Sequence, residues 1–315
     1  MNHSHKILQV CPLPPVLAAR LPEFGPVDVL SEMSDPAAFL AERGGEYTIM
    51  VTSGTVGADA ELMGRMPALQ AICSLGVGYD PIDMDAARAR GIVVSNTPDV
   101  LNDCVADLAM GLLLDVVRGI SAADRHVRRG DWLTKGPTPP TTRVSGKRLG
   151  MLGMGRIGQA IARRAAGFDL DIRYNSRHAK PELSWRHEPS LTALAEWCDF
   201  LVVACSGGAE TRGLVSADVL RALGPQGYLI NISRGTVVDE AALVEILGSN
   251  GLAGAALDVF ENEPEVPVEL FAMDHVVLMP HMGSGTRETR QAMADLVLQN
   301  LKAFLAEGRL VTPVR

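Results

Sequence analysis

Short runs of apolar residues alternate with longer, mostly polar stretches along this chain, beginning in its first third. Each early run is followed within a few residues by Gly, Pro or Asn, which favour turns. Run length and turn boundaries predict four strands, Ile7–Val10, Thr48–Thr52, Leu69–Ser74 and Ile92–Ser95. Because polar and helical stretches separate these runs, we interpret the region as a small α/β unit.

The alternation becomes regular from Lys147 onward. The predicted strands are Arg148–Leu152, Asp171–Tyr174, Phe200–Ala204, Tyr228–Ile232, Ala255–Val259 and Val276–Met279. The predicted helices begin at Arg156 or span Leu191–Trp197, Ala217–Leu223 and Glu240–Leu247, the third with Ser216 as its N-cap and Gly224-Pro225 as its stop. Strands that alternate with helices in this way need a mostly parallel sheet covered on both faces. The predicted fold class is therefore α/β, with two Rossmann-like domains.

Three segments predict how the chain divides into domains. Asn96-Thr97-Pro98 favours a hinge, because Pro restricts the residue before it and blocks continuation of a helix. A long amphipathic segment, Val100–Arg129, follows, and the last helix, Arg287–Glu307, is expected to return to the first unit. The 315 residues suffice for two domains. We expect one domain, residues 1–98 plus 288–315, to be split by a second, inserted domain, residues 99–287.

Charge and cysteine content argue against several function classes. The formal net charge is −8 and no block of Lys or Arg stands out, whereas nucleic acid or an anionic membrane requires a basic patch. The most apolar region, Val105–Val117, is interrupted by Asp107 and Asp115 and is too short to span a bilayer. The chain start lacks a secretory pattern, and the five cysteines form no CxxC pair, which favours reduced thiols and a cytoplasmic location. No His/Cys cluster has metal-ligand spacing, so no metal is expected.

The motif Gly153-Met154-Gly155-Arg156-Ile157-Gly158 follows an apolar strand and opens a predicted helix. This context is what a dinucleotide fingerprint requires, whereas a GxGxxG alone is weak. Gly153 would permit the tight turn, Gly155 the approach of the pyrophosphate, and Gly158 close helix–strand packing. The amides of the helix N-terminus would then bind phosphate. The alternative is a plain glycine turn before a helix.

Polar residues follow the later strands, and in a parallel sheet these strand ends meet at one edge, where ligands bind. They are Arg177, Ser206, Arg234, Glu263 and His281. Reduction of a 2-keto acid needs a cation for the carboxylate, which suits Arg234, and a proton donor for the carbonyl oxygen, which suits His281. Glu263 could favour and orient the imidazolium. The alternatives are a surface Arg, a solvated loop His and a solvated Glu-Pro turn.

The end of the second strand of the glycine-motif domain predicts the cofactor. NAD-binding proteins carry an acid there for the ribose 2′-hydroxyl, but this chain reads Tyr174-Asn175-Ser176-Arg177. Asp169 and Asp171 open the strand and are expected at the far edge of the sheet. We therefore predict NADPH/NADP as cofactor, with Ser176 and Arg177 on the 2′-phosphate, Arg173 and Lys180 as lesser helpers, and NADH as a weaker alternative. In the competing interpretation, Asn175 binds the ribose of NAD and Arg177 is solvated.

At this point the sequence resembles the D-isomer-specific 2-hydroxyacid dehydrogenase family over nearly its whole length, most closely the glyoxylate/hydroxypyruvate reductase branch with the plant hydroxyphenylpyruvate reductases. The matching segments are Leu75-Gly76-Val77-Gly78-Tyr79-Asp80, the glycine motif, Asn231-Ile232-Ser233-Arg234-Gly235, Leu257-Asp258-Val259-Phe260 with Glu263-Pro264, and Pro280-His281. The branch is suggested by residues 103–109 and 280–286. One departure is Ser206-Gly207-Gly208-Ala209-Glu210, where relatives usually carry bulkier residues, which leaves the cofactor contacts of this loop open.

The resemblance implies functional roles for particular residues. Arg234, Glu263 and His281 fall on the catalytic Arg, Glu and His of the family. The loop Leu75, Gly76, Val77 and Gly78 falls on the segment that binds the substrate carboxylate through the backbone of Val77 and Gly78, helped by Arg234 and His281. The implied cofactor contacts are Gly153, Gly155, Arg156, Ile157, Gly158, Asn175, Ser176, Arg177, Cys205, Ser206, Thr211, Ile232, Ser233, Arg234, Asp258, which would meet the nicotinamide amide, His281 and Gly283. The family splits its substrate domain around the cofactor domain, so the resemblance implies that residues 1–98 plus 288–315 form a split, flavodoxin-like substrate domain and residues 99–287 an inserted dinucleotide-binding domain. Family members are usually homodimers joined through the segment matching Val100–Arg129.

Several other functions share parts of this pattern. A formate or phosphite dehydrogenase would share the fold, but nothing indicates their specialised pockets. A short-chain dehydrogenase needs a Tyr-x-x-x-Lys pair, which the four tyrosines lack. A phosphoglycerate dehydrogenase conflicts with the NADP prediction, and a nucleotide-sensing corepressor adds a long tail. The sequence leaves the 2-keto acid itself open among glyoxylate, hydroxypyruvate and larger aryl or sugar keto acids.

Overall fold

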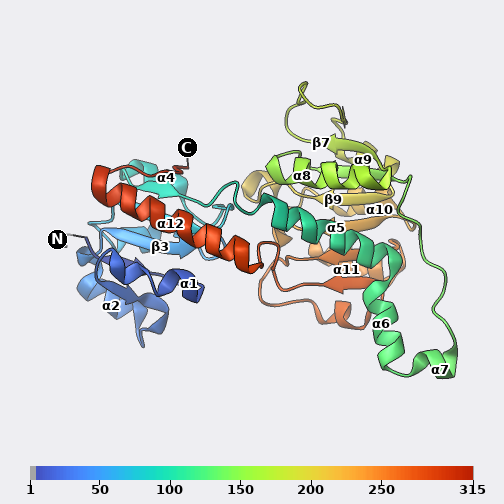
Figure 1. Ribbon diagram of the computed structural model, residues 1–315, viewed down its shortest axis with the longest axis horizontal. Coiled ribbons are helices and arrows are strands. Elements are labelled where there is room, and N and C mark those ends of the chain that lie inside the picture. Colours follow the sequence, from blue (N-terminus) through green and yellow to red (C-terminus); the bar gives the residue numbers. More distant parts are fainter. Residues whose placement is uncertain (1–4, 315) are drawn as a thin grey trace. The chain divides into compact units, whose positions relative to one another are not determined.

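The computed structural model describes residues 5–314 and divides into two compact units (Figure 1). The first unit contains the described residues through Leu101 and those from Ser284 onward, and the second spans Asn102–Gly283. Both units are α/β with parallel sheets, as the alternation of strands and helices predicts.

The first unit is built on a five-stranded sheet of order β2-β1-β3-β4-β5. Its strands are β1 (Ile7–Gln9), β2 (Val27–Val29), β3 (Ile49–Ser53), β4 (Ala71–Leu75) and β5 (Val93–Ser95), all paired in parallel. Its helices are α1 (Pro15–Ala18), α2 (Pro36–Arg43), α3 (Ala60–Gly64), α4 (Met84–Ala89) and α12 (Arg287–Glu307). The four predicted strands are confirmed within about two residues, and α12 returns to this unit as expected, where it contacts β4 and α1. Strand β2 is not among the predicted strands, because it has only three residues, all half-buried.

The second unit contains a seven-stranded sheet of order β12-β11-β10-β9-β6-β7-β8. Its strands are β6 (Arg148–Leu152), β7 (Asp171–Asn175), β8 (Arg186–His187), β9 (Phe200–Val203), β10 (Tyr228–Asn231), β11 (Gly254–Leu257) and β12 (Val276–Leu278). Six of them were predicted, and the two-residue β8 was not. The chain proceeds outward from β6 to β8 and then returns to β9 on the other side of β6, so the strand order reverses between β6 and β9. Ligands of such sheets bind at the carboxyl ends of the strands beside this reversal.

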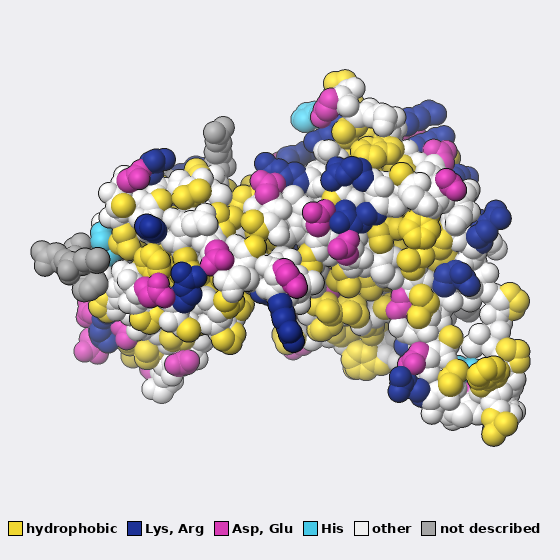
Figure 2. All heavy atoms as spheres, viewed as in Figure 1, with side chains coloured by type: hydrophobic (Ala, Val, Ile, Leu, Met, Phe, Trp, Pro, Cys, Tyr) yellow, Lys and Arg dark blue, Asp and Glu magenta, His cyan; other side chains and the backbone are white. Residues whose placement is uncertain are grey.

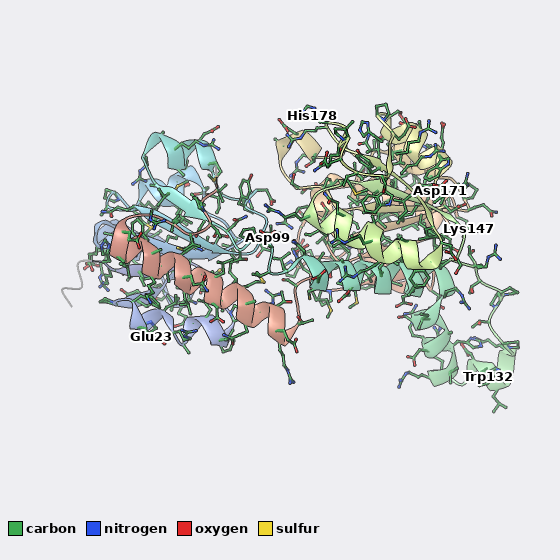
Figure 3. The ribbon with its side chains drawn as sticks, turned by 45° about the horizontal axis from the view of Figure 1, so that its top comes forward. Glu23, Asp99, Trp132, Lys147, Asp171 and His178 are labelled. Atoms are coloured by element: carbon green, nitrogen blue, oxygen red, sulfur yellow. The ribbon has the colours of Figure 1, made fainter. Side chains whose placement is uncertain are left out.

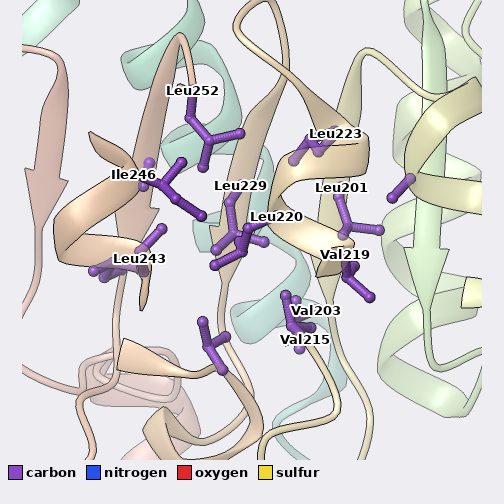
Figure 4. Packing of buried hydrophobic residues seen from close by; sticks show 14 of the residues in the cluster. Leu201, Val203, Val215, Val219, Leu220, Leu223, Leu229, Leu243, Ile246 and Leu252 are labelled. Atoms are coloured by element: carbon purple, nitrogen blue, oxygen red, sulfur yellow. The ribbon is translucent and has the colours of Figure 1, made fainter. Parts of the chain in front are cut away.

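Helices cover both faces of this second sheet. On one face lie α5 (Asn102–Arg118) and α8 (Arg156–Ala165), which pack against each other. On the other lie α9 (Leu191–Trp197), α10 (Ala217–Leu223) and α11 (Glu240–Gly248). Leu201 and Leu229 from the strands are fully buried against Leu220 and Leu243 from the helices (Figure 4). This apolar layer holds the strands in register, which fixes the positions of the loops at their carboxyl ends.

The predicted amphipathic segment Val100–Arg129 contains two helices. Gly119 adopts a left-handed φ of +62° and ends α5, and α6 (Ile120–Arg128) and α7 (Asp131–Lys135) follow. Figure 1 shows α6 and α7 extending away from the rest of the second unit. Ser216 occupies the N-cap position of α10 as predicted, but its side chain makes no capping hydrogen bond, whereas Gly224 ends that helix with φ +75°. Across residues 5–314, no helix combines the length and apolarity needed to cross a membrane.

Candidate active site

The glycine loop between β6 and α8 has the geometry of a phosphate cradle. Gly153 has φ +96°, and a Cβ placed there would lie 2.5 Å from the amide nitrogen of Cys205. A Cβ on Gly158 would collide with the carbonyl oxygen of Gly153, so only glycine lets α8 pack this closely on the loop. A Cβ on Gly155, in contrast, would have no heavy atom within 4 Å apart from its neighbours in the chain. The loop therefore leaves room for a phosphate at the N-terminus of the ten-residue helix α8, which fits a dinucleotide.

The end of β7 carries the residues predicted to select the cofactor. Asn175 donates from Nδ2 to the carbonyl oxygens of Glu188 and Pro189, at 2.9 and 3.1 Å, and so holds the segment that follows β8. The hydroxyl of Ser176 donates to the carbonyl oxygen of His178 at 2.7 Å. Arg177 is exposed and pairs with Glu210, with 2.8 Å between Nη1 and Oε2. Arg177 thus stands at the cofactor edge, but its guanidinium already has an acidic partner.

One predicted helper of phosphate binding is misplaced. The guanidinium of Arg173 lies 4.0 Å from the ring centroid of Trp197, at the end of α9, and this stacking directs it away from the cofactor edge. Asp171, in turn, pairs with the first residue of β6 and lies at the far edge of the sheet as predicted. In Figure 3, Asp171 lies beside Lys147 at that end, whereas His178 lies at the opposite end of the sheet.

The unusual loop after β9 has a defined shape. Gly208 has φ +129°, which a residue with a side chain rarely adopts. The hydroxyl of Thr211 donates to the carbonyl oxygens of Ser206 and Gly208, at 2.9 and 3.2 Å, and closes the loop on itself. Burial raises the pKa of the neighbouring Cys205 thiol, and a hydrogen bond with Ser233 opposes this effect only in part. Cys205 therefore has no activated thiolate and acts as a small packed side chain.

The turn after β10 fixes the backbone that presents Arg234. Asn231 accepts the amide of Ser233 at 3.1 Å and donates to the carbonyl oxygen of Arg234 at 3.0 Å. The Ser233 hydroxyl donates to the carbonyl oxygen of Cys205 at 2.6 Å, which ties this turn to the loop after β9. A Cβ on Gly235 would overlap the backbone of Phe260, so only glycine lets the turn lie against the segment that carries Glu263. Ile232, also predicted as a contact, is almost fully buried.

His281 and Glu263 form a close pair at the ends of β12 and β11. The distance from Nδ1 of His281 to Oε2 of Glu263 is 2.6 Å, and Oε1 of Glu263 accepts the amide of Phe260 at 3.1 Å. Burial acts to raise the pKa of Glu263, but the hydrogen bond to His281 and the charges of His281 and Arg234 lower it on balance. Glu263 is therefore ionised at neutral pH, and its carboxylate can accept a hydrogen bond from Nδ1 of His281. Because Nδ1 is engaged, Nε2 is the ring atom left for proton transfer.

Asp258 holds the loop that carries His281. Its two carboxylate oxygens accept the amides of Met282 and Gly283, each at 2.8 Å, and its own carbonyl oxygen accepts the amide of His281 at 2.9 Å. Burial raises the pKa of Asp258, and the two amide hydrogen bonds counter part of this rise. These bonds support His281 in a left-handed conformation with φ +50°. The resemblance did not predict this supporting role for Asp258.

The loop predicted to bind the substrate carboxylate lies in the first unit, after β4. Leu75 is buried in that strand, and the amide of Gly76 donates to Thr97 Oγ1 at 3.0 Å, so neither is available as a donor. Asn96 donates to the carbonyl oxygen of Val77 at 2.8 Å. Within the part of the chain that the structure describes, the amides of Val77 and Gly78 have no acceptor. These two are thus the candidate anion donors of the loop, and Asn96 and Thr97 are supporting residues that the sequence pattern did not reveal.

The second unit brings most of the sequence-predicted residues to one edge of its sheet. The glycine loop, the end of β7, the loop after β9, the Arg234 turn and the His281–Glu263 pair all follow carboxyl ends of parallel strands. Glu210 is a further residue that the sequence pattern did not reveal, because it pairs with Arg177 across 33 positions and has no local signal. Among residues 5–314, no three or more His, Cys, Asp or Glu side chains are grouped so that they could hold a metal ion.

Comparisons with known proteins agree with this arrangement. The family model described as "D-isomer specific 2-hydroxyacid dehydrogenase, NAD binding domain" matches residues 110–283. The hydroxyphenylpyruvate reductase of Plectranthus scutellarioides is 46% identical over 310 residues, covering 98% of both chains. A glyoxylate/hydroxypyruvate reductase of Arabidopsis thaliana is 44% identical, again over 98% of both. The crystal structure of an NADPH-dependent glyoxylate/hydroxypyruvate reductase from Sinorhizobium meliloti, in complex with NADP and malonate, superposes with a TM-score of 0.91 at 42% identity, covering 99% of this chain and 97% of that one.

Proposed function

Because the chain belongs to the D-isomer-specific 2-hydroxyacid dehydrogenase family, we propose that it reduces a small 2-keto acid to the D-2-hydroxy acid, with NADPH as the preferred cofactor. The observation that carries this proposal is the 2.6 Å His281–Glu263 pair, which shares one sheet edge with Arg234 and the glycine loop. The test is the loss of NADPH absorbance with glyoxylate, hydroxypyruvate and hydroxyphenylpyruvate. Relatives named for the first two and for the last support this choice of substrates. Tight NADPH binding without turnover of any of them would instead favour a nucleotide sensor.

In this mechanism, the bound nicotinamide supplies a hydride to the keto carbon. Protonated His281 donates the Nε2 proton to the keto oxygen, which becomes the hydroxyl of the product. Arg234 binds the substrate carboxylate through its planar guanidinium and orients the carbonyl. Glu263 keeps the imidazole charged and fixes the ring through Nδ1, which makes it a positioning residue. The amides of Val77 and Gly78, in the loop after β4 of the first unit, are candidate donors to a carboxylate.

Replacing Glu263 with glutamine is expected to move the alkaline limb of the kcat profile for reduction to lower pH. The proton donor must be charged, and the ionised Glu263 favours that form. Without its charge, the imidazole loses its proton at a lower pH. The measurement is kcat against pH with saturating NADPH and keto acid. Glu261→Gln, in the same turn, is the matched control and should leave the profile unchanged, and a wild-type profile in Glu263→Gln would exclude Glu263 from this role.

Arg177 is assigned to the 2′-phosphate of NADPH. Arg177→Ala is expected to lower kcat/KM for NADPH by about tenfold, the scale of one charge-assisted hydrogen bond at an exposed site. The loss should fall mainly on KM, because this phosphate is remote from the chemistry, and NADH should be little affected. The matched control is Arg221→Ala, which removes an exposed arginine from a similar pair with Asp218 on α10. A wild type that favours NADH, or an unchanged preference in Arg177→Ala, would contradict the assignment.

The remaining assignments concern the chain as a whole. The first unit is assigned to the substrate and the second to the cofactor, with α6 and α7 as part of a homodimer interface. Four apolar residues of this segment are exposed, namely Ile120, Val127, Trp132 and Leu133, and Figure 2 shows hydrophobic side chains gathered there. Such a patch on a projecting segment supports association. Light scattering should give twice the mass of one chain, and a monomeric mass would contradict the dimer.

Cytoplasmic location also stays a prediction, in keeping with five free cysteines.

A further inference from the structure

The exposed pair between Arg177 and Glu210 lies where the cofactor-selecting residues were predicted. Arg177 follows β7 and Glu210 follows β9, the two strands that flank β6. The glycine loop lies between the segments that carry these two residues. The amide of Gly153 donates to the carbonyl oxygen of Asn175, at the end of β7, at 2.9 Å, and the Cα of Gly153 faces the backbone of Cys205, after β9. The ion pair therefore joins the two loops on either side of the phosphate cradle.

The loop that carries Glu210 is built to hold this position. Gly208 with φ +129° and the two hydrogen bonds of the Thr211 hydroxyl form a closed turn, and Glu210 lies within it. A carboxylate on a flexible loop would sample many directions. The closed turn fixes the backbone of Glu210 and so restricts the positions that its side chain can reach. The acid that the end of β7 lacks in sequence is thus supplied to the same place by a loop 33 residues later.

We propose that Glu210 is a specificity-determining residue that competes with the 2′-phosphate of NADPH for Arg177. This inference rests on the proposed assignment of Arg177 to that phosphate. A guanidinium bound to a carboxylate must release it to pair with a phosphate, and the displaced carboxylate then repels the incoming negative charge. The side chains are 78% and 79% exposed, so the pair is easily opened and Glu210 weakens NADPH binding without preventing it. NADH carries no 2′-phosphate and therefore does not compete with Glu210 for Arg177. Glu210 thus reduces the difference in Kd between NADPH and NADH.

The test measures the direct binding of NADPH, NADH and adenosine 2′,5′-bisphosphate by calorimetry. In Glu210→Gln, Kd for NADPH and for the bisphosphate should fall about two- to fivefold, the range of an exposed ion pair, while Kd for NADH stays unchanged. The gain should shrink in the Arg177→Ala background and also at high salt, which screens exposed charges. Asp218→Asn removes the same charge from the matched Arg221 pair and should give no gain.

Three results would overturn the proposal while leaving the assignment of Arg177 intact. The first is weaker NADPH binding in Glu210→Gln, which would mean that Glu210 orients Arg177 for the phosphate. The second is unchanged binding, and the third is an equal gain in Asp218→Asn, which would indicate a general effect of net charge. If Arg177→Ala alone leaves the preference for NADPH over NADH unaltered, Arg177 does not bind the phosphate, and both the assignment and this inference fail.

Discussion

Replacement of His281 with asparagine is expected to lower kcat for keto-acid reduction by about 10²–10⁴-fold, the contribution of a positioned acid or base. In the proposed mechanism the imidazole gives a proton to the keto oxygen, and an amide cannot replace it at neutral pH. Asparagine is the suitable replacement because His281 has φ +50°, a conformation that asparagine tolerates better than alanine does. The backbone bonds to Asp258 should therefore survive.

Two measurements accompany this variant. Kd for NADPH and the thermal midpoint should stay close to the wild-type values, because neither depends on the proton of the imidazole. His281→Ala should show the same loss of kcat together with some loss of stability from the strained backbone. Near-wild-type kcat in His281→Asn at neutral pH would exclude His281 as the proton donor.

Arg234→Gln is expected to lower kcat/KM for the keto acid by about 10²-fold, which corresponds to about 3 kcal/mol of charge-assisted hydrogen bonding. Arg234→Lys keeps the charge but not the planar fork, so its loss should be smaller yet clear. The turn itself should persist in both variants, because Asn231 binds the amide of Ser233 and the carbonyl oxygen of Arg234 without using the replaced side chain, which itself donates from Nη1 to the carbonyl oxygen of Ser233 at 2.9 Å.

A carbonyl compound without a carboxylate separates binding of the acid group from other effects. With methylglyoxal as substrate, kcat/KM of wild type and of Arg234→Gln should differ much less than with glyoxylate. Methylglyoxal has no carboxylate for the Arg234 guanidinium to bind. An equal loss with both compounds would show that Arg234 acts on the carbonyl or on the fold instead of on the carboxylate.

Local pattern predicted those elements whose form depends on nearby residues. Strand β6 and the start of α8 follow from an apolar run and a glycine motif, and α9, α10 and α12 were predicted with the bounds observed. The amphipathic segment Val100–Arg129 was predicted without its division at Gly119, since glycine inside an amphipathic stretch does not by itself indicate a left-handed break. The short strands β2 and β8 could not be predicted, because two or three residues show no period and depend on their neighbours in the sheet.

The candidate site shows the same division between local and distant information. Parallel topology sufficed to bring Arg234, Glu263 and His281 to one edge, because each follows a strand. The pairing of Arg177 with Glu210, and the stacking of Arg173 on Trp197, depend on side-chain directions and on residues far away in the chain. Such contacts carry no local signal, so the sequence predicted Arg177 at this edge but not the carboxylate of Glu210 that pairs with it.

The hydrogen bonds between Asp258 and the backbone of residues 281–283 determine which positions of this loop tolerate substitution. The Asp258 carboxylate binds main-chain amides, which every residue at position 282 provides, and the Met282 side chain itself is exposed. Position 283 differs, because a Cβ there would lie 3.1 Å from the Asp258 carboxylate. A designed library can therefore vary position 282, beside His281, while Gly283 and Asp258 are kept. Tolerance to substitution changes from one residue to the next along this short loop, because one position presents an exposed side chain and the next has almost no room for one.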